Sequence, residues 1–311
     1  MRYLIVHNTL AGFGSDAIYE FERALLQRGG DECCLRTIDN REETFEWAVK
    51  DARDFDLVVV SGGDGTISRI LYELRGSPVP ICAFPSGTAN LLNINLGNSL
   101  EPATLARACH ARVTASCDLG ELAWEDNGMP HSRGFDIIAG IGFDAQVMGT
   151  ADSNKEAMGE AAYFAAALSN TNPPVLHFVV ECDGTRREFD GIGCMVANNA
   201  TIQGDIQIVP DCRMDDGYLD VIVIESPDAI QLVRPLIAGL FDRSGKQLGR
   251  PHITSMKARH AVITASEPSP LQIDGNLVCE QTLSYTADVI ANANQIIVDR
   301  TSPYNPANVR R

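Results

Sequence analysis

A glycine-rich segment follows an apolar run near position 60. Residues 57–60 are apolar without interruption, and the next six are Ser61-Gly62-Gly63-Asp64-Gly65-Thr66. Glycines let backbone N–H groups approach a phosphate without Cβ obstruction, and a helix that begins here would present its positive end to an anion. Asp64 would face such phosphates, either through magnesium or by orienting the loop. The pattern predicts a phosphate-binding turn, and the alternative is a glycine-rich turn without a ligand.

A second loop with related chemistry follows the next strand-like stretch, residues 80–84. Its sequence is Pro85-Ser86-Gly87-Thr88-Ala89-Asn90, whose hydroxyl and amide groups suit the sugar and phosphates of a nucleotide. Pro-Ser-Gly-Thr is also common turn chemistry. However, open α/β sheets bind ligands at the carboxyl ends of their strands. We therefore expect both loops to line one crevice.

Several aspartates lie at predicted strand ends. Asp274, within Leu271-Gln272-Ile273-Asp274-Gly275-Asn276, could accept the proton of a substrate hydroxyl, which phosphoryl transfer requires. The alternative is a structural Asp-Gly β-turn. Asp216, before Gly217, could form a turn or a cation site, and Asp118 and Asp144 could be plain caps.

The sequence lacks or only weakly matches the motifs of several other nucleotide-binding families. The sequence has no GxxxxGK[ST] segment and lacks the protein-kinase motifs. The segment Gly12-Phe13-Gly14-Ser15-Asp16-Ala17 matches the loose dinucleotide pattern, but it does not directly follow the first strand. The six histidines are dispersed and indicate surface or satisfied core positions. The nine cysteines show no metal-ligand spacing, which favours reduced thiols.

The elements that must position these residues change character near residue 115. Strand-like and helix-like stretches alternate before that point, which predicts an open, mainly parallel sheet with helices. Strand-like stretches then dominate, among them residues 135–139, with helices expected at 155–168 and 227–240 and a hairpin turn at Asp183-Gly184. We expect an α/β nucleotide-binding domain over residues 1–115 and an antiparallel β-sandwich or barrel domain over 116–311, with residues 291–311 able to pack back on the first domain.

The amino-acid composition limits the classes of molecule that the protein is expected to bind. The net charge of −16 argues against nucleic acid. No apolar stretch approaches the ~20 residues of a membrane helix, and the N-terminus lacks a signal-peptide pattern. A cytoplasmic protein is expected, with peripheral membrane contact if the substrate is a lipid. Residues 243–266 carry five basic residues and no acid, which predicts either a solvated loop or a local patch facing a membrane or phosphate.

Taken in order, these motifs resemble the diacylglycerol kinase catalytic family, which includes sphingosine kinases, ceramide kinases and bacterial soluble lipid kinases. The resemblance covers nearly the whole chain. Its motifs are Asn8-Thr9-Leu10-Ala11-Gly12, SGGDGT at 61–66, PSGTAN at 85–90, Gly140-Ile141-Gly142-Phe143-Asp144-Ala145, Lys155…Gly159…Tyr163, Asp216-Gly217-Tyr218-Leu219-Asp220 and Ile273-Asp274-Gly275. GGDGT alone is shared with NAD kinases and the phosphofructokinase-like superfamily, whereas the combination is more specific.

The resemblance implies an ATP- and Mg²⁺-dependent lipid kinase with a phosphofructokinase/NAD-kinase-like α/β domain and a β-sandwich. Asp274 would be the general base, and Asp64 and Asp118 would belong to the magnesium network. The nucleotide-binding residues would be Asn8, Thr9, Ser61, Gly62, Gly63, Asp64, Gly65, Thr66, Ser86, Gly87, Thr88 and Asn90. Arg213, Asp216 and Tyr218 would form a structural cation site, in which nearby backbone carbonyls complete the ligands around Asp216. The partner would be a lipid at the membrane surface, and a homodimer is compatible with this assignment.

Two positions depart from the family pattern. Leu91 follows Asn90 where many bacterial members carry aspartate, and Asn276 stands where the family has glutamate. Asn276 can donate and accept hydrogen bonds but carries no charge. Two alternatives therefore stay open: a nucleotide- or lipid-binding sensor with impaired catalysis, and a kinase of a soluble acceptor, as in NAD kinases.

Overall fold

The computed structural model describes most of the chain. The described residues are 1–11, 16–27, 29–39, 45–87, 90–142, 174–202, 206–225, 242, 244–246 and 250–308. Thr88, Asp144 and the helices expected at 155–168 and 227–240 lie outside them. The chain divides into two compact units, Met1–Leu119 with Ala291–Arg311, and Gly120–Ile290. Each unit is described by itself below.

Unit 1 contains a parallel sheet. Its strands run in the order β2 (Glu32–Ile38), β1 (Arg2–Asn8), β3 (Leu57–Gly62) and β4 (Ile81–Pro85). The end of β16 (Asn276–Ile297) extends this sheet, because Ile296 pairs with Ile81 in the same direction. The apolar run 57–60 is fully buried, as expected for a parallel strand covered on both faces.

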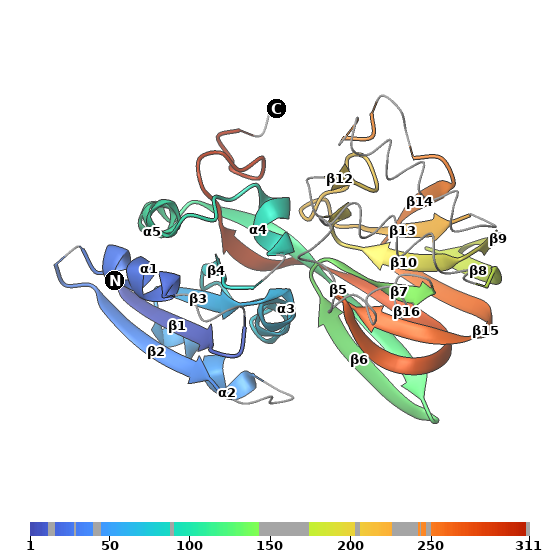
Figure 1. Cartoon of the computed structure of the whole chain (residues 1–311), viewed down its shortest axis with the longest axis horizontal. Helices are drawn as coiled ribbons and strands as arrows, with labels where there is room; N and C mark the ends of the chain where they lie inside the picture. The colour runs from blue at the N-terminus through green and yellow to red at the C-terminus, as the bar shows by residue number, and fades with distance from the viewer. Residues whose placement is uncertain are drawn as a thin grey trace, which may run out of the picture. The chain divides into compact units, whose positions relative to one another are not determined.

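Helices cover this sheet (Figure 1). They are α1 (Ala17–Leu25), α2 (Glu46–Val49), α3 (Asp64–Glu73), α4 (Leu91–Leu96) and α5 (Pro102–Ala111), with a 3-10 turn at Ala52–Asp54. Helices α1 and α5 bury their apolar faces in one cluster with alternate residues of β1 and β3. Within that cluster the rings of Phe21 and Phe84 lie 4.9 Å apart. No described helix is long and apolar enough to span a membrane.

Unit 2 consists mainly of antiparallel strands. They are β6 (Met129–Phe135), β7 (Ile138–Gly142), β8 (Leu176–Cys182), β9 (Thr185–Gly191), β10 (Gly193–Ala197), β13 (Leu219–Ile224), β14 (Ile253–Ala258) and β15 (His260–Ile273), with short strands β11 (Thr201–Ile202) and β12 (Ile206–Gln207). Strand β5 (Thr114–Asp126) begins in unit 1 and pairs with β6 in unit 2. The neighbours run β14-β13-β10-β7-β15, and β15 also pairs with β8 and β16.

The core of unit 2 has the two-residue period of strands. Cys194 and Val196 of β10 face one cluster with Val221 of β13, whereas Met195 and Ile222 face a second cluster on the other side. The predicted fold class, an α/β part followed by a mainly-β part, is confirmed. The predicted strand at 135–139 is wrong, because β6 ends at Phe135 and β7 begins at Ile138.

Candidate functional site

The two glycine-containing loops of unit 1 contact each other directly. Strands β3 and β4 are neighbours, with Gly62 opposite Pro85, so both loops leave the same edge of the sheet. A Cβ on Gly87 would lie 2.6 Å from the Cα of Gly63, closer than any real side-chain carbon comes. The loops therefore meet backbone to backbone, and glycine at position 87 is needed for that contact.

Asp64 lies where these loops join. It is the first residue of α3, and Gly63 is the N-cap. Its carboxylate accepts a hydrogen bond of 3.4 Å from the N–H of Leu92 in α4, the helix that follows the second loop. The first turn of a helix attracts negative charge, so this position suits a phosphate, whereas the Asp64 carboxylate itself suits a cation bound to that phosphate.

Asn8 reaches this region from the end of β1. Its side-chain amide donates to the hydroxyl of Thr66 at 2.7 Å, and its side-chain oxygen accepts from the N–H of Leu10. Thr9 turns towards β2, where its hydroxyl donates to the carbonyl of Ile38 at 3.0 Å. The structure therefore brings Asn8, but not the Thr9 hydroxyl, to the SGGDGT loop.

Asn90 closes the second loop on itself. Its side-chain oxygen accepts from the N–H of Gly87, and its amide donates to the carbonyl of the same residue, both at 2.9 Å. The backbone of Asn90 has φ 50°, a conformation that asparagine tolerates better than most residues. Asn90 thus fixes the shape of the loop.

A hydrogen-bonded chain behind the loops was missed by the sequence-based prediction. The Nδ1 of His7 lies 2.9 Å from the hydroxyl of Ser61, which lies 2.6 Å from the hydroxyl of Ser86. His7 stands opposite Ser61 in the β1–β3 register and is buried. Burial lowers the pKa of His7 from its usual value, which favours the neutral ring. The chain links both loops to the strand next to them.

Asp274 occupies the turn between β15 and β16 in unit 2. Its φ is 45° and that of Gly275 is 76°, so the expected Asp-Gly turn is present. The carboxylate accepts from the N–H groups of Asp136, Ile137 and Ile138 at 3.0–3.2 Å. An ionised carboxylate offers about four acceptor positions. The side chain is thus held in one orientation by the chain segment that begins β7.

The neighbouring residue Asn276 supports the same turn. Its side-chain amide donates to the carbonyl of Asp274 at 3.1 Å, and the residue is exposed. The side-chain oxygen of Gln272 accepts from the N–H of Gly275 at 2.9 Å. The uncharged residue at 276 therefore contributes to the shape of the turn.

Asp118 is buried in unit 1. Its carboxylate accepts a hydrogen bond of 2.7 Å from the N–H of Asn292, whose backbone has φ 54°. Among the described residues no group of three or more histidine, cysteine or acidic side chains is arranged to hold a metal ion. A shared site of Asp64 and Asp118 for magnesium stays a prediction.

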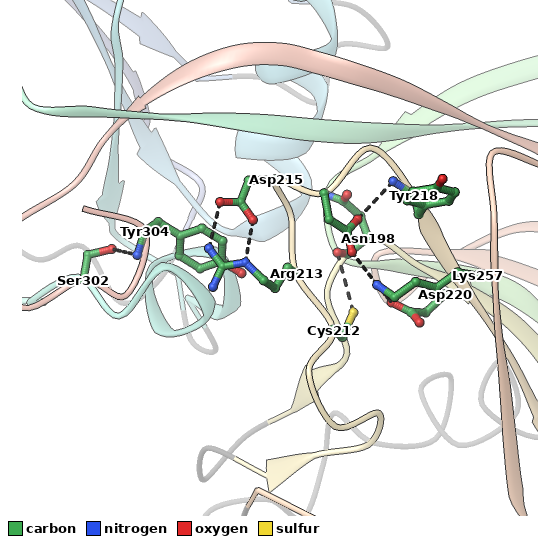
Figure 2. Close-up of polar contacts among 10 residues, drawn as sticks. Asn198, Cys212, Arg213, Asp215, Tyr218, Asp220, Lys257, Ser302 and Tyr304 are labelled. Atoms are coloured by element: carbon green, nitrogen blue, oxygen red, sulfur yellow. Dashed lines mark hydrogen bonds and ion pairs between the residues drawn. The ribbon is translucent and has the colours of Figure 1, made fainter. Parts of the chain in front are cut away.

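The three residues expected to form a structural cation site have protein partners (Figure 2). The guanidinium of Arg213 donates two hydrogen bonds of 2.7 Å to Asp215. The carboxylate of Asp216 accepts from the N–H of Tyr218 at 3.0 Å and from the ammonium of Lys257. Burial lowers the pKa of Lys257, but its hydrogen bond to Asp216 and nearby negative charge outweigh this and raise it overall.

Other basic residues of the 243–266 segment also interact with the protein itself. Lys246 pairs with Asp211 at 2.6 Å, and Arg250 donates to the carbonyls of Gln207 and Asp242. The guanidinium of Arg259 lies 4.8 Å from the centre of the Tyr218 ring. Lys246 is thus paired with an acid, whereas Arg250 and Arg259 contact uncharged groups and keep their positive charge.

Two family descriptions match the sequence of this chain. Residues 2–122 match the "Diacylglycerol kinase catalytic domain", and residues 137–298 match the "YegS C-terminal NAD kinase beta sandwich-like domain". The first match contains both glycine-containing loops and Asp118. The second contains Asp216, Lys257 and Asp274.

Individual relatives agree with these matches. The chain is 27% identical over 279 residues to a diacylglycerol kinase of Mycobacterium tuberculosis, covering 88% of this chain and 87% of the relative. It is 26% identical to a diacylglycerol kinase of Staphylococcus carnosus, covering 83% and 78%. A solved structure from Bacillus anthracis, described as a diacylglycerol kinase, superposes with a TM-score of 0.75 at 20% identity, covering 96% of this chain and 97% of the other.

Proposed function

Because the chain belongs to the diacylglycerol kinase catalytic family, we propose that it transfers the γ-phosphate of ATP to a hydroxyl group of a diacylglycerol, a sphingoid base or a related lipid. The observation that carries the proposal is the contact between the SGGDGT and PSGTAN loops, with Gly63 against Gly87. Two such loops at adjacent strand ends provide backbone N–H groups and a helix N-terminus for a nucleotide's phosphates.

Asp64 is the carboxylate of unit 1 that fits a magnesium–nucleotide complex. Magnesium in phosphotransfer enzymes is commonly held by one or two carboxylates together with the substrate phosphates, and a larger protein cage is not needed. Bound there, the ion would neutralise charge on the transferred phosphoryl group. Asp64 is already oriented by the N–H of Leu92, and Asn8 supports the loop through Thr66. Ser86 and Thr88 are the proposed hydroxyl contacts to the nucleotide.

Asp274 is the proposed acceptor of the proton that leaves the lipid hydroxyl. Three backbone N–H groups orient its carboxylate, and a carboxylate oxygen is a suitable acceptor for a substrate O–H. A fixed carboxylate meets the need of phosphoryl transfer for positioning more than for covalent chemistry. Asn276 is uncharged where the family carries glutamate, and it holds the turn through the carbonyl of Asp274.

The experiment is a phosphotransfer assay with purified protein, magnesium and γ-labelled ATP, using diacylglycerols and long-chain bases in mixed micelles. Label is expected in the organic phase, and it should depend on Asp64, so that Asp64→Asn reduces both nucleotide affinity and turnover. Nucleotide binding without transfer to any acceptor would contradict the kinase proposal and favour a sensor.

A second candidate acceptor is a soluble hydroxyl compound. The observation that favours it is the similarity of residues 137–298 to a domain described as NAD kinase β-sandwich-like. When NAD is added to the same assay as a soluble acceptor, label transferred to NAD and unaffected by the micelles would select this candidate over a lipid acceptor.

A further inference from the structure

The turn that precedes β13 in unit 2 places two carboxylates near one ammonium group. Asp216 lies in the turn, where the N–H of Tyr218 donates to one carboxylate oxygen at 3.0 Å. The other oxygen pairs with Nζ of Lys257. The same Nζ lies 3.5 Å from a carboxylate oxygen of Asp220. Lys257 thus bridges Asp216 and Asp220; Figure 2 shows Lys257 next to Asp220.

The β-sheet fixes this arrangement. Asp220 of β13 and Lys257 of β14 stand directly opposite each other in the antiparallel register. Asp220 is only 3% exposed, and a buried carboxylate is costly unless a positive charge or hydrogen-bond donors compensate it. Residues opposite each other across a ladder stay within reach of one another. Lys257 is therefore placed by the fold to neutralise Asp220.

Two arginine side chains lie in or next to this turn. Arg213 is bound to Asp215 through two parallel hydrogen bonds. Arg259 stacks over the Tyr218 ring, which brings a second positive charge to the same turn. A divalent ion at Asp216 would have to displace the Lys257 ammonium and would meet the Arg259 guanidinium nearby. The carboxylate that a metal ion would need is therefore already paired with the ammonium of Lys257.

We propose that in this chain the ammonium of Lys257 takes the position of the structural cation next to Asp216, so that unit 2 needs no divalent ion there. An ammonium is a compact point charge with three N–H donors, so it can bond to both carboxylates at once. The proposal concerns only residues of unit 2 and does not depend on the nucleotide, the acceptor or the proposed activity.

The experiment uses the full chain, purified without chelator and free of nucleotide. Its metal content is measured by elemental mass spectrometry, and its thermal unfolding is recorded in excess EDTA and in millimolar CaCl₂ or MgCl₂. The wild-type protein is expected to carry far less than one ion per chain. Its melting temperature should be the same in EDTA as in CaCl₂ or MgCl₂. This arm needs no variant of Lys257.

The informative variant is Lys257→Met, which keeps the aliphatic stem and removes the charge. It leaves Asp220 without its counter-charge, so in EDTA the melting temperature should fall by about 2–6 °C. Added CaCl₂ should recover part of this loss, because two carboxylates are then available to an ion. The recovery should be absent from the Lys257→Met, Asp216→Asn double variant, and Lys257→Arg should stay independent of added ions.

A matched control is Lys246→Met. Lys246 also pairs with one aspartate, Asp211, but both side chains are largely exposed and no second acid is described beside them. This variant should change the melting temperature little and gain no response to CaCl₂.

Two results would overturn the proposal. One is a wild-type protein that holds about one ion per chain and whose melting temperature falls in EDTA, while the melting temperature of Asp216→Asn does not fall in EDTA. The other is a Lys257→Met protein whose melting temperature equals that of the wild type and does not respond to CaCl₂.

Discussion

Two Asp-Gly turns in unit 2 have nearly the same local structure. Asp183 and Asp274 both have left-handed backbones, with φ 48° and 45°, and each is followed by a glycine with φ near 80°. Each turn closes a two-residue hairpin, since Cys182 pairs with Thr185 and Ile273 pairs with Asn276. The Asp-Gly pair is thus sufficient to specify the turn in both places.

Each turn also docks on a third strand in the same way. The N–H of Asp183 donates to the carbonyl of His260, and its carboxylate accepts from the N–H groups of Arg259 and His260. The N–H of Asp274 donates to the carbonyl of Ile138, and its carboxylate accepts from three N–H groups at 136–138. An anchored carboxylate in a turn is therefore a structural device in this fold, whether or not it takes part in catalysis.

The difference between the turns is their surroundings. Asp183 is exposed, and its hydrogen-bonding partners Arg259 and His260 are exposed too. Asp274 is half-buried, and it binds a segment in which Asp136 and Ile137 are almost fully buried. Local geometry alone cannot assign a catalytic role to Asp274, so Asp183 provides the control needed to test it.

The largest expected effect separates the two aspartates by activity. Asp274→Asn should lower kcat at least ~10²-fold, because it removes the proton acceptor while keeping a side chain that tolerates positive φ. Asp183→Asn should leave kcat close to the wild-type value. Phosphotransfer rates and nucleotide affinities of both variants provide the check, and the nucleotide affinities should not change. Equal losses of activity in the two variants would reduce Asp274 to a structural residue.

A smaller difference is expected in stability. Asp183→Ala and Asp274→Ala each leave backbone N–H groups without an acceptor, which costs about 1–3 kcal/mol where water cannot replace it. Asp274→Ala should lie at the upper end, because its donors Asp136 and Ile137 are buried, whereas Arg259 and His260 can bond to water. Urea denaturation measures both free energies of unfolding. A greater loss for Asp183→Ala would contradict this view of the two environments.

The glycines should behave alike. Gly184 and Gly275 have φ 81° and 76°, and alanine at either position would be strained by about 1 kcal/mol. A Cβ on Gly184 would meet no atom within 4 Å, so strain of the backbone is the only expected cost there. Gly184→Ala and Gly275→Ala should therefore lower the free energy of unfolding by similar amounts. A much larger loss at 275 would reveal steric crowding that the other turn lacks.

The smallest effect is expected at the position after each glycine. Asn276→Glu restores the charge that the family carries, and Thr185→Glu makes the same change in the other turn. If Asn276 mainly supports the turn through the carbonyl of Asp274, turnover should change by less than about threefold in either variant. A large gain of turnover in Asn276→Glu alone would show that the natural residue impairs catalysis.

The sequence predicted the elements that depend on local pattern. The apolar run at 57–60 forms a buried strand, since a strand covered on both faces needs uninterrupted apolar residues. The Asp183-Gly184 hairpin is confirmed, since Asp-Gly is a typical two-residue hairpin turn. Glycine is a poor helix former, so the pattern at SGGDGT favours a helix that starts after Thr66, whereas the helix begins at Asp64 with Gly63 as its N-cap.

Contacts between distant segments could not be predicted in the same way. The predicted strand at 135–139 is interrupted because Asp274, more than 130 residues away, binds the N–H groups at 136–138. The bond between His7 and Ser61 depends on the register of two parallel strands, and the ion pair between Lys257 and Asp220 depends on the register of two antiparallel ones. No pattern within a short window of sequence encodes such registers.

The most direct test of the lipid kinase proposal is phosphorylation of a total lipid extract by the purified protein. The extract is incubated with magnesium and ATP carrying a heavy-oxygen label in its γ-phosphate, and the products are identified by mass spectrometry. The account predicts a labelled phosphomonoester on a lipid hydroxyl, formed by the wild type and by Asp183→Asn but not by Asp274→Asn. Label in no lipid product, or equal labelling by Asp274→Asn, would contradict it.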